Sequence, residues 1–161
     1  MLMQKPFTLT QGGADSAVET TLNTTIQPGI TLGAWQLRAV EFTIKPDLLK
    51  AWAAADADFT LQMTKRSLSG SIARIVTYSD QDLLMSLNQA VIASGTPANL
   101  AVQDATWYVN LPDGIVIYSE AIYLQLITTG TGQTNVVWGR LLYEAINLTQ
   151  AEAFAIVASR P

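Results

Sequence analysis

Short stretches of alternating apolar and polar residues, each closed by a turn signal, constrain the fold of this chain more than any other feature. The longest is AWQLRAVEFTIKP, residues 34–46. Similar stretches occupy residues 7–11, 17–26, 58–66, 72–78, 105–111, 115–119, 121–128 and 135–146, with Gly, Pro, Asn and Asp clusters between them. Successive side chains of a strand point to opposite faces, so this pattern predicts many short β-strands.

The apolar face changes side within the longest stretch. Trp35 and Leu37 share one face, whereas Val40, Phe42 and Ile44 share the other. A β-bulge reverses the faces of a strand in this way, and so does a strand that is buried differently at its two ends. We expect one of these two arrangements within residues 34–46.

Three segments carry helical signals instead: residues 45–57, 79–94 and 149–158. In the second, apolar residues recur at helical spacing, at Leu83, Leu84, Leu87 and Val91. In the third, Thr149 and Glu152 have the spacing of a capping box. The helices interrupt a series of strands and do not alternate with them, as they would around a parallel sheet.

These elements predict an all-β protein: an antiparallel β-sandwich of jelly-roll type, with eight or nine strands and two or three short helical inserts. We expect a single domain over residues 1–161, with a short N-terminal arm (about 1–15) and a short C-terminal helix (about 149–158). Residues 112–114, Pro-Asp-Gly, predict a hairpin turn between 105–111 and 115–119. Residues 121–128 and 135–146 form a second predicted hairpin.

The loop of the second hairpin contains Gly130-Thr131-Gly132, which raises the question of a phosphate-binding loop. Such a loop runs into a helix N-terminus, where free N–H groups meet the anion. Here a β-branched and aromatic run follows, no Lys-Ser or Lys-Thr is present, and Asn135 stands where a third glycine would be. The sequence therefore favours a simple hairpin loop over a nucleotide site.

The amino-acid composition excludes several classes of chemistry. The chain has no cysteine and no histidine. Disulfides, thiolate zinc sites, cysteine nucleophiles, Ser–His triads and histidine metal sites are therefore all impossible. We expect neither an enzyme nor a cofactor-binding protein.

The charge of the chain is low. It carries 9 basic and 13 acidic residues, for a net charge of −4, and its sequence pI is about 4.6. The basic residues are scattered, so we expect no direct nucleic-acid binding and no docking on an anionic membrane. No apolar run is long enough to span a bilayer, and we expect no signal peptide.

Charged residues form only 14% of the chain, against about 25% in ordinary soluble domains. Hydrophobic residues form 49%, and the mean hydropathy is +0.24. A chain with so few charges exposes apolar surface, which in soluble proteins marks sites of association. We therefore expect much of the surface to be covered by further copies. A compact monomer with a hydroxyl- and amide-rich exterior is the alternative.

Two Asp-x-Asp pairs are weak candidates for oxygen ligands of a divalent cation: Asp56 with Asp58, and Asp80 with Asp82. Neither has the third ligand and glycine of an EF-hand loop. Asp58 in a turn, and Asp80 and Asp82 in the first turn of a helix, explain these residues without a metal.

Three glutamates lie in or beside predicted strands: Glu41, Glu120 and Glu144. A hydrolase that uses a carboxylate pair would need two of them close together in a cleft. Strand glutamates more often face solvent, so we expect no catalytic residue among them.

Aromatic side chains offer two further interpretations. Trp107 and Tyr108 are adjacent in a predicted strand, so they face opposite sides and one of them meets solvent or a partner. We regard both as interface candidates, together with Thr131 and Gln133 in the glycine loop. A carbohydrate-binding β-sandwich with an exposed aromatic platform is the alternative.

The C-terminal region LPDGIVIYSEAIYLQLITTGTGQTNVVWGRLLYEAINLT resembles single jelly-roll virion proteins in its order of turn, strands, loop and last strand. It covers about a quarter of the chain. The resemblance implies a capsid or virion surface subunit that is located in the virion. It implies that the partners are copies of the same chain, in trimers or pentamers, together with other virion proteins. A spike or decoration protein fits equally well. The N-terminal arm has a single lysine, so the resemblance implies a genome packaged by another component.

Overall fold

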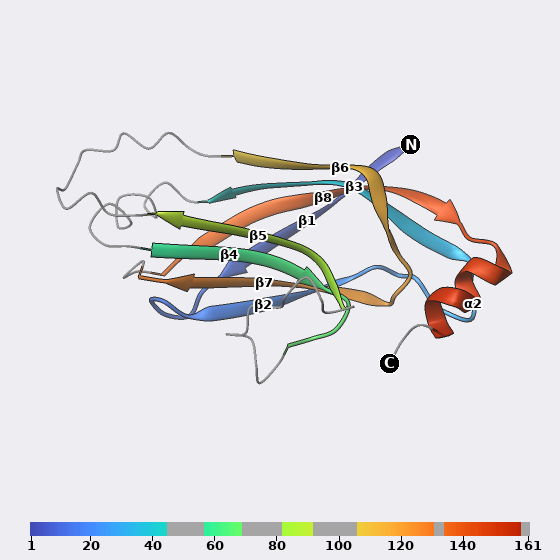
Figure 1. Cartoon of the computed structure of the whole chain (residues 1–161), viewed down its shortest axis with the longest axis horizontal. Coiled ribbons are helices and arrows are strands. Elements are labelled where there is room, and N and C mark those ends of the chain that lie inside the picture. The colour runs from blue at the N-terminus through green and yellow to red at the C-terminus, as the bar shows by residue number, and fades with distance from the viewer. Residues whose placement is uncertain (45–56, 69–81, 92–105, 131–133, 159–161) are drawn as a thin grey trace.

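The computed structural model describes residues 1–44, 57–68, 82–91, 106–130 and 134–158. In the described residues, eight strands and one helix follow one another along the chain (Figure 1). They are β1 (Leu2–Thr10), β2 (Ala17–Asn23), β3 (Gly33–Ile44), β4 (Ala57–Thr64), β5 (Leu83–Val91), β6 (Thr106–Ile117), β7 (Ala121–Thr129), β8 (Val136–Asn147) and α2 (Gln150–Ala158).

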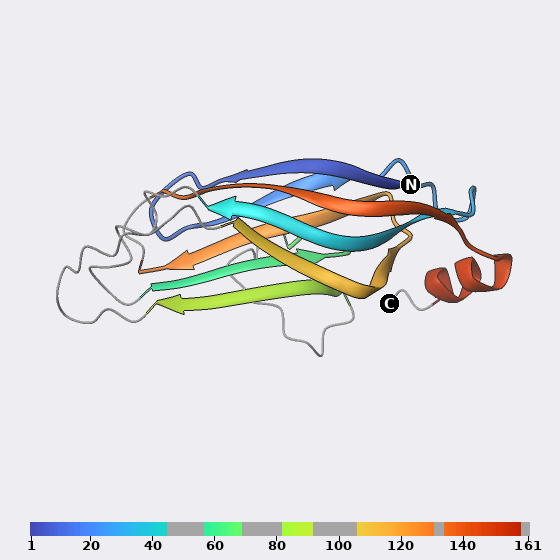
Figure 2. The same ribbon diagram turned by 90° about the horizontal axis from the view of Figure 1, so that it is seen from above.

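The strands form two four-stranded antiparallel sheets, which we call sheet A (order β1-β8-β3-β6) and sheet B (order β2-β7-β4-β5). The two sheets lie face to face along the length of the molecule (Figure 2). Apart from β4 and β5, consecutive strands lie in opposite sheets, so the chain passes back and forth across the sandwich. This double Greek-key order is that of a jelly roll, and it confirms the predicted fold class.

The core lies between the inner faces of the two sheets. Leu37 and Phe42 from sheet A and Leu61, Leu124 and Leu126 from sheet B have at most 1% of their surface exposed. The rings of Phe42 and Phe59 pack nearly parallel, with centroids 6.3 Å apart. Burying these side chains on two facing sheets is the main source of stability of the sandwich.

The apolar face of β3 switches at a β-bulge, as the sequence predicts. The pairing of β3 with β8 shifts between Leu37 and Ala39, which leaves Arg38 as the extra residue on this side. The pairing with β6 shifts at the same place, but there the extra residues belong to β6. Trp35 and Leu37 before the bulge, and Val40 and Phe42 after it, are all buried. One inserted residue thus keeps both halves of the strand turned toward the core.

The predicted hairpin at residues 112–114 is wrong. Residues on both sides of this segment pair with the same strand, β3: Ile115 opposes Leu37 and Asn110 opposes Ala39. The segment is an irregularity inside one continuous strand, β6, because it lies opposite the bulge of β3. Gly114, at φ +70°, provides the left-handed conformation that the irregularity requires.

The second predicted hairpin is also wrong. β7 lies in sheet B between β2 and β4, whereas β8 lies in sheet A between β1 and β3. The glycine loop therefore connects two sheets and does not reverse the chain within one. Gly130 has a φ of +73°, and residues 131–133 lie outside the described part of the chain. The sequence pattern locates both strands and carries no information on their partners.

The predicted helix at 79–94 is replaced by β5 over Leu83–Val91. Leu83, Met85 and Leu87 also alternate with a period of two, and short apolar runs satisfy both periods. Hydrogen bonding to β4 along the whole of β5 decides for the strand. The predicted helix at 45–57 and the predicted strand at 72–78 lie, except for Ala57 at the start of β4, outside the described residues.

Both ends of the described chain form regular secondary structure. Residues 2–10, expected within an N-terminal arm, form β1 and pair with β8 throughout. At the other end, α2 begins with the predicted capping box: the Thr149 N–H and hydroxyl donate to Glu152 Oε2 (2.8 and 2.7 Å), and the Glu152 N–H donates to Thr149 Oγ1 (3.3 Å). These hydrogen bonds hold the pKa of Glu152 below its usual value.

Candidate assembly surface

The outer face of sheet A carries large exposed side chains where an antiparallel sheet in water ordinarily carries polar ones. Trp138 of β8 is 47% exposed and Tyr108 of β6 is 59% exposed. Both point away from the core, because their neighbours Val137 and Trp107 point toward it. Trp and Tyr are the side chains that most often anchor protein interfaces.

An ion pair lies beside both aromatic residues. Glu41 of β3 opposes Tyr108 on one side and Arg140 of β8 on the other. Arg140 donates to Glu41 Oε2 from both Nε (3.0 Å) and Nη2 (2.7 Å), and its Nη1 donates to Gln4 Oε1 at 3.0 Å. The Arg140 guanidinium thus links β8 to β3 and to β1, and the Glu41 carboxylate balances its charge.

We call Trp138, Tyr108, Glu41 and Arg140 the outer-face cluster. Tyr108, Glu41 and Arg140 stand in one row across the sheet. Trp138 stands in the next row with three threonines, Thr8, Thr43 and Thr106, and the Thr43 and Thr106 hydroxyls are 3.0 Å apart. All these residues stand on pleated strands that pair with their neighbours along most of their length, so little conformational freedom remains to be lost on binding. The surface is thus preformed for contact with another protein.

The structure places the interface candidates that were chosen from the sequence in different environments. Trp107 is half-buried and stacks on Phe42, with ring centroids 5.4 Å apart and planes at 10°, so it belongs to the core. Tyr108 faces out, and the expectation that the two residues divide between core and surface is confirmed. Thr131 and Gln133 lie outside the described residues.

Trp138 was missed at the sequence level. Its signal is its position one residue after the apolar Val137 in an alternating strand, which places it on the opposite face. The Glu41–Arg140 pair was also missed, because residues 99 positions apart become neighbours only when β3 and β8 pair.

The acidic candidates do not form a site. Asp58 is exposed on β4, and Asp82 forms an ion pair with Arg66. Asp56 and Asp80 lie outside the described residues. Within the described ranges, no group of three or more acidic side chains is placed to hold a metal ion.

The strand glutamates likewise have other partners. Glu41 pairs with Arg140, and Glu144 pairs with Arg38 at 2.8 Å. Glu120 lies at the turn between β6 and β7, and its backbone carbonyl accepts a hydrogen bond from Thr24.

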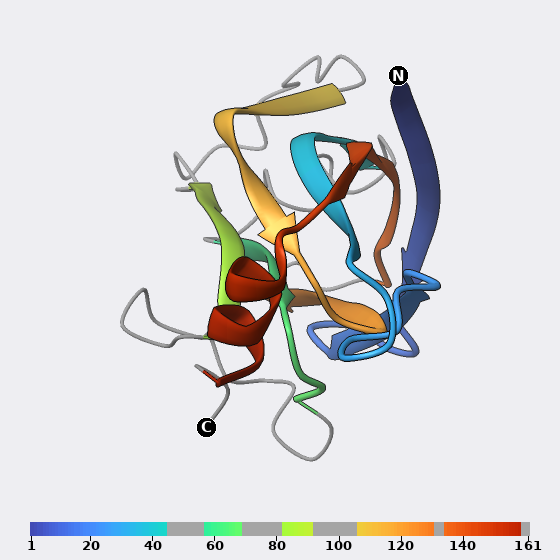
Figure 3. The same ribbon diagram turned by 90° about the vertical axis from the view of Figure 1, so that its right-hand side faces the viewer.

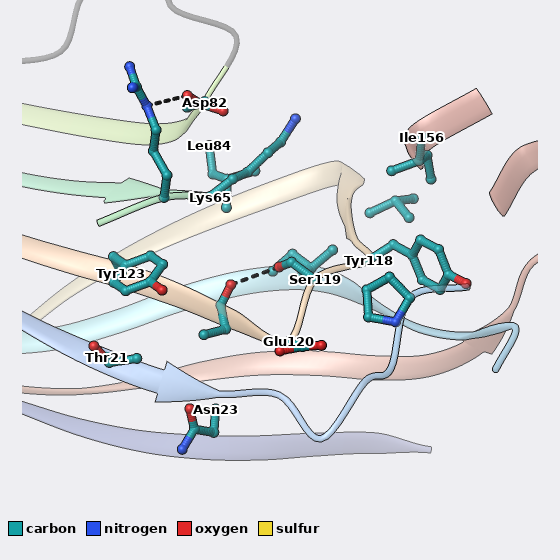
Figure 4. Close-up of a pocket in the computed structure, with 15 residues that line it drawn as sticks. Thr21, Asn23, Lys65, Asp82, Leu84, Tyr118, Ser119, Glu120, Tyr123 and Ile156 are labelled. Atoms are coloured by element: carbon teal, nitrogen blue, oxygen red, sulfur yellow. Dashed lines mark hydrogen bonds and ion pairs between the residues drawn. The ribbon is translucent and has the colours of Figure 1, made fainter. Parts of the chain in front are cut away.

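A cavity of about 1140 Å³ lies at the end of sheet B beside this turn (Figure 4). Its lining mixes polar and apolar side chains, including Lys65, Glu120, Tyr123 and Ile156. Tyr118 closes one end, where its hydroxyl donates to the Thr31 carbonyl at 2.5 Å. Of the two carboxylates in the lining, the one on Asp82 is paired with Arg66, so the described lining offers no carboxylate pair for acid–base chemistry.

In the part of the chain that the structure describes, no helix has the length and apolar character needed to cross a membrane.

Comparisons with known proteins point to the fold alone. No protein-family model matches the sequence, and neither does any curated protein. Among solved structures, the unassembled VP1 pentamer of Merkel cell polyomavirus matches with a TM-score of 0.51 and 7% sequence identity, over 89% of this chain and 94% of that one. The chain has the jelly-roll fold of a viral capsid protein. The same VP1 in complex with 3'-sialyllactosamine matches with the same TM-score, identity and coverage.

Proposed function

We propose that this protein is a structural subunit of a virion, which assembles with copies of itself into a capsid or a surface layer and performs no chemistry. The observation that carries the proposal is the outer-face cluster: Trp138 and Tyr108 beside a charge-matched Glu41–Arg140 pair, on the outer face of one sheet of a jelly roll. The likeness of the fold to a capsid protein supports it.

Assembly would follow from burial of this surface. Each exposed aromatic side chain contributes about 25 cal/mol for every Å² of apolar area that it removes from water. Because Arg140 and Glu41 already satisfy each other, the pair loses less hydration free energy on burial than two lone charges would. Lost rotational and translational freedom offsets much of this gain, so single contacts are weak and their repetition by symmetry stabilises the shell.

The test is the mass of the purified protein over a range of concentrations, by light scattering after size exclusion, with electron microscopy of the largest species. We expect an oligomer well above 17.4 kDa that builds larger particles. Trp138→Ala and Tyr108→Ala should each weaken association by roughly tenfold or more. Tyr123→Ala, on sheet B, is the matched control and should leave the mass unchanged. A monomer at every concentration would overturn the proposal.

A carbohydrate-binding module is the competing function. Trp138 and Tyr108 lie two strands and two residues apart on one face, a separation of about 12 Å, which a short oligosaccharide on an aromatic platform spans. A glycan array separates the two ideas. Binding that is lost in both alanine variants, from a protein that stays monomeric, would favour the module, whereas assembly without glycan binding favours the structural subunit.

A further inference from the structure

The helix α2 has an unusual surface for the end of a soluble domain. Glu152 is the only ionised side chain in Gln150–Ala158, and its carboxylate is engaged by Thr149. Ala153 is buried, yet Phe154 is 74% exposed and Val157 is 39% exposed. A helix that is apolar on every side is ordinarily buried on every side. In the single chain, α2 instead projects at one end of the sandwich (Figure 2), the end that faces the viewer in Figure 3.

A shallow groove lies at the same end of the molecule. It has a volume of about 290 Å³ and runs between the segment before β3 and the end of β8. Ile26, Ala34, Trp35 and Ile146 provide its apolar lining, and no described lining residue is ionisable. Its volume is below that of most small-molecule pockets, so it suits one side chain and not a larger ligand.

The floor of the groove is rigid. Trp35 is only 7% exposed and stacks on Tyr143, with ring centroids 3.9 Å apart and planes at 21°. This stacking fixes Trp35, so the part of its ring that reaches the groove gives it a rigid floor, against which a further aromatic side chain packs favourably.

One wall of the groove is held in a strained conformation. Thr25 lines it with a φ of +66°, a left-handed conformation that β-branched residues rarely adopt. Its neighbour Thr24 fixes it there: the Thr24 N–H donates to the Glu120 carbonyl at 2.9 Å, and the Thr24 hydroxyl donates to the Ser119 carbonyl. Strain that a structure maintains in this way occurs mainly at binding sites.

We propose that Phe154 of one copy inserts into this groove on a second copy. An exposed aromatic side chain and an uncharged cleft with an aromatic floor are complementary, and neither side must strip water from an ion. The helix and the groove lie at the same end of the molecule, so two copies related by a two-fold axis make this contact twice. Each subunit then uses both its helix and its groove. This inference rests on the proposed self-assembly and names one contact within it.

A second copy fits these features better than another occupant does. The exposed parts of Phe154, Val157, Ile30 and Leu32 amount to on the order of 400 Å², the size of a functional patch on a monomer. A stable interface needs about 800 Å² per partner. Adding the groove brings the buried area per partner toward this value only when each copy contributes both surfaces to one interface, as in a two-fold contact that is made twice.

The absence of cysteine in the chain provides a clean test by cross-linking. Phe154→Cys places a thiol at the inserting position on α2. In a second protein, Ala145→Cys places a thiol on the groove lining. When the two are mixed under mild oxidation, we expect a disulfide-linked dimer in several-fold excess over either protein alone. Mixing Ala145→Cys with Thr21→Cys, exposed on β2, is the control and should give no such excess.

A second variant measures the contribution of the contact to assembly. Phe154 is exposed, so Phe154→Ala should fold normally and raise the concentration at which copies associate by roughly tenfold or more. Leu2→Ala, at another exposed apolar position, should shift this association concentration by less than threefold. Assembly by light scattering with no cross-link in the mixture, and with no effect of Phe154→Ala, would overturn this inference and leave the proposed function standing. A monomer under all conditions would overturn both.

Discussion

Gly139 occupies a tightly packed position in sheet A. It lies on β8 opposite Phe7 of β1 and Phe42 of β3. A Cβ atom there would come within 2.3 Å of Phe7 Cζ and within 2.6 Å of the Glu41 carbonyl oxygen. The ring of Phe7 thus occupies the space that a side chain would need, and one of its two obstacles is backbone that cannot rotate away.

We therefore predict that Gly139→Ala lowers the free energy of unfolding by about 1–3 kcal/mol, the usual cost of overpacking a core. Urea denaturation followed by tryptophan fluorescence measures it. Gly33→Ala is the matched control, because a Cβ atom added at Gly33 would have no heavy atom within 4 Å, and it should change stability by less than about 0.5 kcal/mol. Equal stabilities of the two variants would contradict this account of Gly139.

Residue-scale prediction from sequence succeeds for relative orientation and fails for absolute orientation. Alternation places Trp107 and Tyr108 on opposite faces, and this is what the structure shows. Which of them faces the core depends on the partner strand: Trp107 opposes Phe42 and stacks on it. Strand pairing likewise decides that Trp138 faces outward, because the absolute orientation of β8 is set only when β8 pairs with β3.

At the scale of the element, the bulge of β3 permits a test of register. Deleting Arg38 leaves the order Leu37-Ala39-Val40, in which buried and outward positions alternate regularly. Deleting Glu41 instead moves Phe42 to the outer face, because each one-residue shift reverses the side chains beyond it. Each deletion also removes one exposed ion pair, with Glu144 or with Arg140, so the two variants are matched in charge interactions.

We predict that the Arg38 deletion keeps a cooperative unfolding transition, whereas the Glu41 deletion loses about 3–5 kcal/mol through the exposure of Phe42 or fails to fold. Near-ultraviolet circular dichroism and urea denaturation distinguish these results. If both deletions were equally damaging, the bulge itself, and not the register that it sets, would be the essential feature.

Elements differ in how far their own sequence determines them. The bulge and the capping box of α2 were predictable, because each depends on residues close together in the chain. The segment of β5 was predicted as a helix, since Leu83, Leu84 and Leu87 satisfy a helical period as well as a strand period. The edge of β4 decides between them by supplying hydrogen-bond partners, and a neighbouring strand is not visible in a local pattern.

For the whole molecule, the predicted class was right and two predicted connections were wrong. Both errors assumed that strands next to each other in sequence pair as a hairpin. In this sandwich only β4 and β5 do so among the described strands, and the other connections lead from one sheet to the other. The crossing pattern depends on long-range pairing such as β1 with β8, which joins residues more than 120 positions apart.

The low charge of the molecule leads to a prediction about salt. Each copy carries a net charge of −4, so copies repel one another at long range. The outer-face cluster has its charges already paired within one chain, the described groove lining has no ionisable residue, and Glu152 is the one charge on α2. Few ion pairs between copies would therefore be lost by screening. Raising the salt concentration from about 0.1 M to 1 M shortens the screening length from about 10 Å to 3 Å and removes most of the repulsion.

We therefore predict that association strengthens with salt, by severalfold in the midpoint concentration measured by light scattering. An assembly held by ion pairs between copies would respond in the opposite direction, since salt weakens those pairs. Thermal unfolding of the Trp138→Ala variant at each salt concentration controls for changes in the stability of the single chain. Dissociation at 1 M salt would show that attraction between charges, and not burial of Trp138, Tyr108 and Phe154, holds the copies together.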